Sequence, residues 1–226
     1  MDQQPTEEEL KVIAANLRQP SGEPGIAIGE AMNEGNGPMN LHTLAVLNPQ
    51  ANDRILEIGM GNGHFVRNIL LLDPSIRYIG CDFSETMVAE SQQRNQQFLE
   101  DGRAQFHLAN ASKLPLDDAS VNKIFTINTV YFWDEPEAIL TELHRVLSDD
   151  GQLIISFRPP EIMAQYPVTQ WGFTPRSRSE VQTLLADNKF TPTNATEVSE
   201  PDQEAWGRTF ERKSIMVVAQ KRTAAG

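Results

Sequence analysis

The feature that constrains this fold most is a glycine-rich stretch at residues 54–65, R-I-L-E-I-G-M-G-N-G-H-F. An apolar run ends there in alternating glycines, which is typical of a buried parallel strand that turns into a helix. We expect Gly59 to adopt backbone angles closed to other residues. Gly61 and Gly63 are expected to remove side chains where a nucleoside would press on the loop. The stretch therefore predicts a strand, a glycine turn and a helix.

Two neighbouring residues favour a cationic nucleoside over a dinucleotide. His64 stands where the pattern G-x-G-x-x-G needs a small residue for close packing of the helix on the strand. Glu57, at the predicted strand end, would repel a pyrophosphate but suits a cation. S-adenosylmethionine, a sulfonium with an ammonium group and no phosphate, meets these conditions better than NAD.

Two motifs, E-I-G-M-G-N-G at 57–63 and Y-I-G-C-D-F-S-E-T-M at 78–87, resemble the class I S-adenosylmethionine-dependent methyltransferases. The resemblance covers about residues 53–159 and continues more loosely to the end. It implies an α/β fold with a doubly wound, mostly parallel seven-stranded sheet, helices on both faces and a C-terminal antiparallel hairpin. We expect one structural domain, with residues 1–52 as a helical cover or lid and residues 53–226 as the cofactor-binding part.

The resemblance also implies the residues that hold the cofactor. Asp82 ends the second predicted strand and is expected to accept hydrogen bonds from the ribose. Phe83 suits the adenine face, although Phe83 and Met87 suit the core as well. Asn110 replaces the Asp of many relatives, and its amide oxygen is expected to accept from the adenine amino group. The full expected set is Glu57, Gly59, Met60, Gly61, Gly63, Asp82, Phe83, Met87, Asn110, Ala111, Ser112 and Asn128.

Aromatic residues at the end of the fourth predicted strand, 121–127, indicate where the substrate binds. Tyr131, Phe132 and Trp133 follow that strand, and substrates meet cofactors at the carboxyl edge of such sheets. We predict that Tyr131 lines the pocket. His64 is the other candidate for a catalytic role, with packing at the helix start as its alternative. Because a sulfonium is already an activated methyl donor, we assign no general base.

Segments outside these motifs predict a cover over the pocket. Thr6-Glu7-Glu8-Glu9 is a capping box that predicts a first helix. Residues 19–38, rich in Gly, Pro, Asn and Glu, predict a loop that is either a lid or a plain surface loop. Residues 39–47 predict a helix. The aromatic-rich segment 162–174 either completes a substrate pocket or caps the core.

Composition limits the partners of this site. The 226 residues carry a formal net charge of -12, which argues against nucleic acid as a substrate. Cys81 is the single cysteine, and we find no signal peptide and no apolar run of about 18 residues. These features predict a cytoplasmic protein without a membrane or metal partner, and they assign no oligomeric state.

The sequence predicts a methyl acceptor that is small, partly apolar, and neutral or cationic. We expect it to enter between residues 19–38 and the aromatic residues Tyr131, Trp171 and Phe173. A module that binds S-adenosylmethionine without turnover is the alternative function, and a nicotinamide-dependent oxidoreductase is a more distant one.

Overall fold

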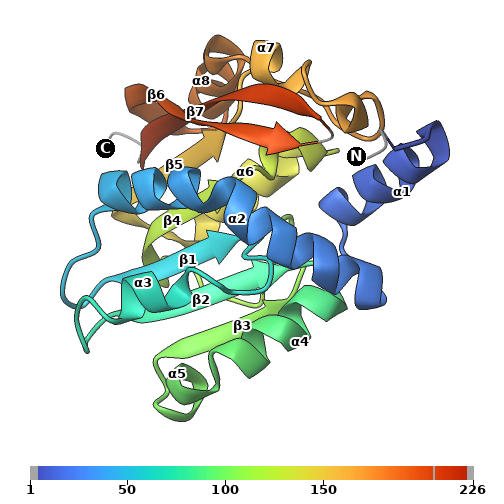
Figure 1. Ribbon diagram of the computed structural model, residues 1–226. Helices are drawn as coiled ribbons and strands as arrows, with labels where there is room; N and C mark the ends of the chain where they lie inside the picture. The colour runs from blue at the N-terminus through green and yellow to red at the C-terminus, as the bar shows by residue number, and fades with distance from the viewer. Residues whose placement is uncertain (1–4, 206, 223–226) are drawn as a thin grey trace.

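The computed structural model describes residues 5–205 and 207–222, and its centre is a seven-stranded sheet in the order β3-β2-β1-β4-β5-β7-β6 (Figure 1). The five neighbouring strands β3, β2, β1, β4 and β5 are parallel to one another. Strand β7 lies between β5 and β6 and runs antiparallel to both. The predicted fold class is therefore confirmed. The strands are β1 Arg54–Ile58, β2 Arg77–Asp82, β3 Ala104–Leu108, β4 Val121–Ile127, β5 Leu147–Phe157, β6 Phe190–Ala205 and β7 Arg208–Lys221.

Helices cover both faces of the sheet, and an apolar core lies under each layer (Figure 1). Leu44 and Leu47 of α2 lie in one core with residues of α3 and α4, and Leu140 and Leu143 of α6 lie in the other with residues of α8. The helices are α1 Glu7–Arg18, α2 Gly22–Leu47, α3 Val66–Leu70, α4 Glu85–Arg94, α5 Gln96–Glu100, α6 Pro136–Val146, α7 Pro160–Met163 and α8 Arg178–Asp187, with short 3-10 turns η1 Val130–Phe132 and η2 Pro167–Gln170.

The prediction of a loop at 19–38 is wrong for most of its length, because α2 begins at Gly22 and continues to Leu47. Its glycines allow close approach rather than loop formation. A Cβ atom on Gly25 would lie 2.6 Å from the carbonyl carbon of Pro20, and one on Gly29 would lie 3.3 Å from the Met87 side chain. Tertiary packing thus outweighs the low helix propensity of this segment.

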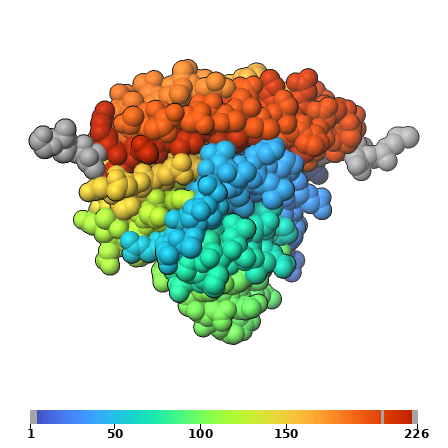
Figure 2. Space-filling model, turned by 90° about the vertical axis from the view of Figure 1, so that its left-hand side faces the viewer, coloured from blue at the N-terminus to red at the C-terminus, as the bar shows by residue number. Residues whose placement is uncertain are grey.

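Pro38 lies inside α2, three residues after Gly35. The guanidinium groups of Arg158 and Arg212 both donate to the carbonyl oxygen of Gly35, at 3.4 and 2.8 Å. These bonds hold a helix whose own ladder lacks the N–H of a proline. In Figure 2 the blue atoms of α2 lie between the orange and red C-terminal hairpin and the teal and green half of the molecule.

The first helix begins at the predicted capping box, with reciprocal bonds between Thr6 and Glu9. Its buried face, Leu10 and Ala14, packs against Val168 together with the partly buried Trp171 and Phe173. The aromatic segment 162–174 therefore holds α1 in place. The sequence left open whether this segment completes a substrate pocket or packs as a cap, and the structure shows packing. Within the described residues, no helix is both long and apolar enough to cross a membrane.

Gly63 offers a test of helix-to-loop packing, because its φ is +67° and a Cβ atom there would lie 2.8 Å from Cβ of Ser91 in α4. Gly102 has a nearly equal φ of +66° and open space around it. Backbone strain alone predicts that Gly102→Ala costs about 1 kcal/mol. Gly63→Ala adds overpacking and should cost roughly 2–5 kcal/mol, measured by urea unfolding. Equal losses in the two variants would contradict the packing role.

Candidate functional site

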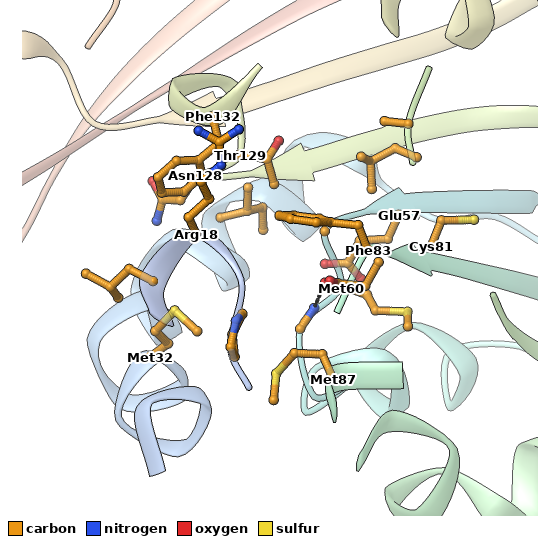
Figure 3. Close-up of a pocket in the computed structure, with 18 of the residues that line it drawn as sticks. Arg18, Met32, Glu57, Met60, Cys81, Phe83, Met87, Asn128, Thr129 and Phe132 are labelled. Atoms are coloured by element: carbon orange, nitrogen blue, oxygen red, sulfur yellow. Dashed lines mark hydrogen bonds between the residues drawn. The ribbon is translucent and has the colours of Figure 1, made fainter. Parts of the chain in front are cut away.

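A cavity of about 480 Å³ opens at the carboxyl edge of the parallel strands, where β1, β2 and β4 end. Figure 3 shows Glu57, Met60 and Phe83 on one side of it, Met32 and Arg18 of the N-terminal helices on the other, and Asn128 and Phe132 above. The topology explains this position, because the strand order reverses beside β1, and ligands of open α/β sheets bind at such a point. Its volume lies in the usual range for small-molecule sites.

The glycine loop lets the backbone reach the cavity. Gly59 has φ +71°, and a Cβ atom on it would lie 2.4 Å from Cγ2 of Thr129, so any side chain there would clash with the segment that follows β4. Gly61 has φ +56° and nothing within 4 Å of its Cβ position, so its backbone faces open cavity. Gly63 does not line the cavity. Its position differs from the one we expected, since the space beside it is filled by Ser91 of α4 and by Asn95, which follows that helix.

Glu57 brings a carboxyl group to the cavity wall while only 6% of the residue is exposed. The hydroxyl of Tyr78 donates to Glu57 Oε2 at 2.5 Å. Burial, with a smaller contribution from Asp82, raises the pKa of Glu57 to about 8, although the Tyr78 hydrogen bond opposes the shift. No described Lys or Arg forms an ion pair with Glu57. A buried carboxyl group that faces a cavity without a counter-charge suits a cationic ligand.

Asp82 lies beside Glu57 at the end of the neighbouring strand. Its two oxygens accept from the backbone N–H groups of Gly61, at 3.0 Å, and Ser84, at 2.9 Å. Burial raises the pKa of Asp82 to about 6 in spite of these bonds. Each oxygen retains a lone pair, so the carboxylate can also accept from the hydroxyls of a ribose. Phe83, 39% exposed, lines the same part of the cavity.

Except for Gly63, every residue of the expected cofactor set lines this cavity. One of them differs in detail from its expected contact. Asn110 Oδ1 accepts from the backbone N–H and the hydroxyl of Ser112, at 3.0 and 2.9 Å. The amide nitrogen of Asn110, rather than the oxygen that we expected to meet adenine, is therefore left for a ligand.

Neither candidate for a catalytic role lines the cavity. Tyr131 is 3% exposed and directed into the core, because consecutive residues of the 3-10 turn η1 point about 120° apart. Phe132 and Trp133 line the cavity in its place. His64 is exposed, with Nδ1 3.4 Å from Arg94 Nη1. None of the four histidines, all in the described part of the chain, lines the cavity.

The sequence did not indicate the wall that α2 contributes. Met32, Asn33, Asn36 and Asn40 line the cavity from one face of this helix. Their spacing of three and four residues is a helical signal, but the surrounding glycines and Pro38 concealed it.

The segment between α1 and α2 crosses the mouth of the cavity and is held on both sides. Arg18 pairs with Asp134 in the loop after η1, and Gln19 Nε2 donates to the carbonyl oxygen of Phe83 at 3.1 Å. Trp171 and Phe173, which we expected at the entrance, do not line the cavity. In residues 5–205 and 207–222, no group of three or more His, Cys, Asp or Glu residues is placed to hold a metal ion.

Comparisons with known proteins agree with this geometry. Residues 56–155 match the family described as methyltransferase domain. The chain is 37% identical over 109 residues to the putative methyltransferase YrhH of Bacillus subtilis, covering 47% of this chain and 58% of that protein. It is 24% identical over 175 residues to 27-O-demethylrifamycin SV methyltransferase of Amycolatopsis mediterranei, covering 72% of this chain and 63% of that protein. The chain thus spans less than two thirds of each of these relatives.

Among solved structures, the chain resembles the complex of a putative methyltransferase with the Haloferax volcanii Trm112 methyltransferase activator. The TM-score is 0.76 with 19% identity, covering 88% of this chain and 95% of the matched chain. This likeness shows the shared fold.

The buried carboxyl group of Glu57 leads to a binding prediction. Glu57→Gln keeps an oxygen for Tyr78 but removes the charge, so affinity for S-adenosylhomocysteine, which retains the ammonium group, should fall roughly tenfold to a hundredfold. Because the pKa of Glu57 is about 8, wild-type affinity should rise between pH 6 and pH 8 as the carboxyl group ionises. Calorimetric titration measures both, with the exposed Glu161→Gln as control. A flat pH profile in the wild type would contradict this assignment.

Glu57 should lower the free energy of unfolding of the ligand-free protein as the pH rises. Below the unfolded-chain pKa of 4.5, both states hold the proton. As pH rises towards 8, Glu57 loses its proton in the unfolded chain but keeps it in the folded protein, so stability is lost. Without ligand, Glu57→Gln should therefore match the wild-type Tm near pH 4.5 and exceed it at pH 8, by differential scanning calorimetry. A lower Tm for the variant at pH 8 would show that the charge stabilises the fold.

Proposed function

We propose, on the premise that this chain contains a class I S-adenosylmethionine-dependent methyltransferase domain, that it transfers a methyl group to a small-molecule acceptor. The observation that carries the proposal is a single cavity with two ends. One end is lined by Asp82 and by Glu57, whose carboxyl group has no cationic partner. The other end is lined by Met32, Phe132 and Leu17.

The residues at the first end fit the cofactor. Glu57 would face the ammonium group, Asp82 would accept from the ribose hydroxyls, and Gly61 would let the nucleoside approach the loop. Phe83 and Met87 offer apolar surface for the adenine. S-adenosylmethionine supplies the methyl group on a sulfonium, already activated for in-line transfer to a nucleophile.

The second end supports a small acceptor. Residues 1–52 would act as a cover, because α1 and α2 enclose this end and Arg18 pairs with Asp134 across the mouth. A polymer would need that cover to open, and the net charge of -12 disfavours nucleic acid. The rifamycin methyltransferase among the relatives is named for a small-molecule substrate, which agrees with this choice.

The contribution of the protein is positioning and exclusion of water rather than acid-base chemistry. No histidine lines the cavity. Of its four acidic residues, Glu57 and Asp82 lie at the proposed cofactor end, Asp134 is paired with Arg18, and Glu135 is the one left for a base at the acceptor end. We therefore favour an acceptor whose nucleophilic atom loses its proton readily. The same lack of a histidine favours, as second candidate, a module that binds S-adenosylmethionine without turnover.

Incubation with methyl-labelled S-adenosylmethionine and fractions of a metabolite extract tests the proposal. Label in a small-molecule product supports methyl transfer, while saturable cofactor binding without labelled product supports the second candidate. Tighter binding of NAD than of S-adenosylhomocysteine would contradict both and favour an oxidoreductase. Efficient labelling of tRNA or protein instead of a small molecule would overturn the choice of acceptor.

Phe132 should matter for turnover but not for the cofactor. Phe132→Ala removes a wall of the acceptor end, so label transfer should fall at least about tenfold while affinity for S-adenosylhomocysteine stays within about threefold. Leu71→Ala, at a 65% exposed site away from the cavity, is the control. Unchanged transfer in Phe132→Ala would place the acceptor elsewhere.

A further inference from the structure

A chain of hydrogen bonds runs from the core to the cavity wall through Tyr131. The backbone N–H of Arg158, on the segment after β5, donates to the Tyr131 hydroxyl oxygen. That hydroxyl donates to Asn128 Oδ1 at 3.0 Å. Asn128 Nδ2 then donates to Asn36 Oδ1 of α2 at 3.1 Å. Both asparagines line the cavity, whereas Tyr131 does not.

The backbone N–H of Arg158 fixes which atoms donate and which accept along these hydrogen bonds, because it can only donate. The Tyr131 oxygen is therefore an acceptor, and its proton must go to another partner. Asn128 Oδ1 at 3.0 Å is nearer than the carbonyl oxygen of Arg158 at 3.3 Å. Burial raises the pKa of Tyr131, so the phenol keeps that proton. Asn128 consequently turns its oxygen to Tyr131 and its nitrogen to Asn36.

The orientation of Asn128 determines what the cavity wall presents. Asn36 uses its oxygen to accept from Asn128, so its Nδ2 group is left for the cavity, and no described residue accepts from it. Asn128 Nδ2 carries a second hydrogen as well. Two neutral amides that line the cavity, one on α2 and one directly after β4, thus keep N–H donors for a ligand.

This pair lies beside the expected position of the methyl donor. Thr126 of β4 is in register with Ile58 of β1, and Thr129 contacts the position of Gly59. Asn128 itself has φ 56°, a left-handed conformation that costs a non-glycine residue about 1 kcal/mol. Figure 3 shows Asn128 and Phe132 together on the same side of the cavity.

We propose that Asn36 and Asn128 form a subsite for a neutral carbonyl oxygen of the methyl acceptor, and that Tyr131 is the positioning residue that orients both amides. Charge supports a neutral partner, since Glu57 and Asp82 line the same cavity and would repel an anion. An ammonium group is disfavoured as well, because it can only donate hydrogen bonds and the two amides also offer donors. This proposal rests on the proposed function, because it assigns the acceptor end of that cavity. It moves Asn128 from the expected cofactor set to the acceptor.

Two probes of matched shape test the subsite without knowledge of the acceptor. Cyclohexanone accepts hydrogen bonds, whereas cyclohexylammonium only donates them. In protein saturated with S-adenosylhomocysteine, cyclohexanone should shift the ¹⁵N side-chain resonances of Asn36 and Asn128, and cyclohexylammonium should shift them at least about threefold less. Equal shifts with both probes, or none with cyclohexanone, would overturn the subsite. A wild-type protein that does not bind S-adenosylhomocysteine would instead contradict the proposed function.

Variants separate recognition from positioning. Asn36→Asp keeps an oxygen for Asn128 but removes both donors, so its affinity for cyclohexanone should fall about tenfold while that for cyclohexylammonium rises. Tyr131→Phe should move the Asn128 side-chain resonance without any probe and weaken cyclohexanone about threefold to tenfold. Tyr166→Phe is the control, because Tyr166 neither lines the cavity nor belongs to the chain of hydrogen bonds. It should leave both the Asn128 resonance and the affinity for cyclohexanone unchanged. An unmoved Asn128 resonance in Tyr131→Phe would remove the positioning role, and an unchanged probe preference in Asn36→Asp would remove the subsite.

Discussion

The packing of α2 across the sheet is the interaction on which the rest of this structure depends. Its C-terminal half buries Leu44 and Leu47 on one face of the sheet, and its N-terminal half forms a wall of the cavity. Glycines at 25 and 29 permit the close contacts with Pro20 and Met87. Without this helix, one core would be open to water and the cavity would lack its asparagine wall.

Polar bonds hold α2 in register with the sheet where apolar packing ends. Arg158 forms a buried ion pair with Glu200 of β6, and both Arg158 and Arg212 donate to the Gly35 carbonyl. A buried pair of this kind adds little net stability but fixes one arrangement, because any other leaves a charge unpaired. The same Arg158 supplies the N–H that orients Tyr131, so the position of the helix and the chemistry of the cavity wall are linked.

The cavity concentrates features that cost free energy in the folded protein. The pKa values of Glu57 and Asp82 are raised to about 8 and about 6 by burial, and Asn128 adopts a left-handed conformation. Each is unfavourable for folding alone, and in the function that we propose each is offset when a ligand supplies the missing cation, hydroxyls or oxygen. Their location in one cavity is therefore a stronger indication of function than any of them singly.

The sequence alone determined the sheet, its glycine turn and most of the cavity wall that we propose for the cofactor, because strand ends and loop glycines act through neighbours along the chain. Glu57, Asp82 and Asn128 each lie at or beside the end of a strand, and parallel strands bring such ends together. Only the tertiary structure decided that residues 22–38 of the expected cover are helical, and which residues line the proposed acceptor end. Residues 22–38 form a helix because the sheet and α4 pack against it, which overrides local propensity. Tyr131 points into the core and Phe132 into the cavity because the rotation of a single 3-10 turn sets their directions, which no spacing in the sequence records.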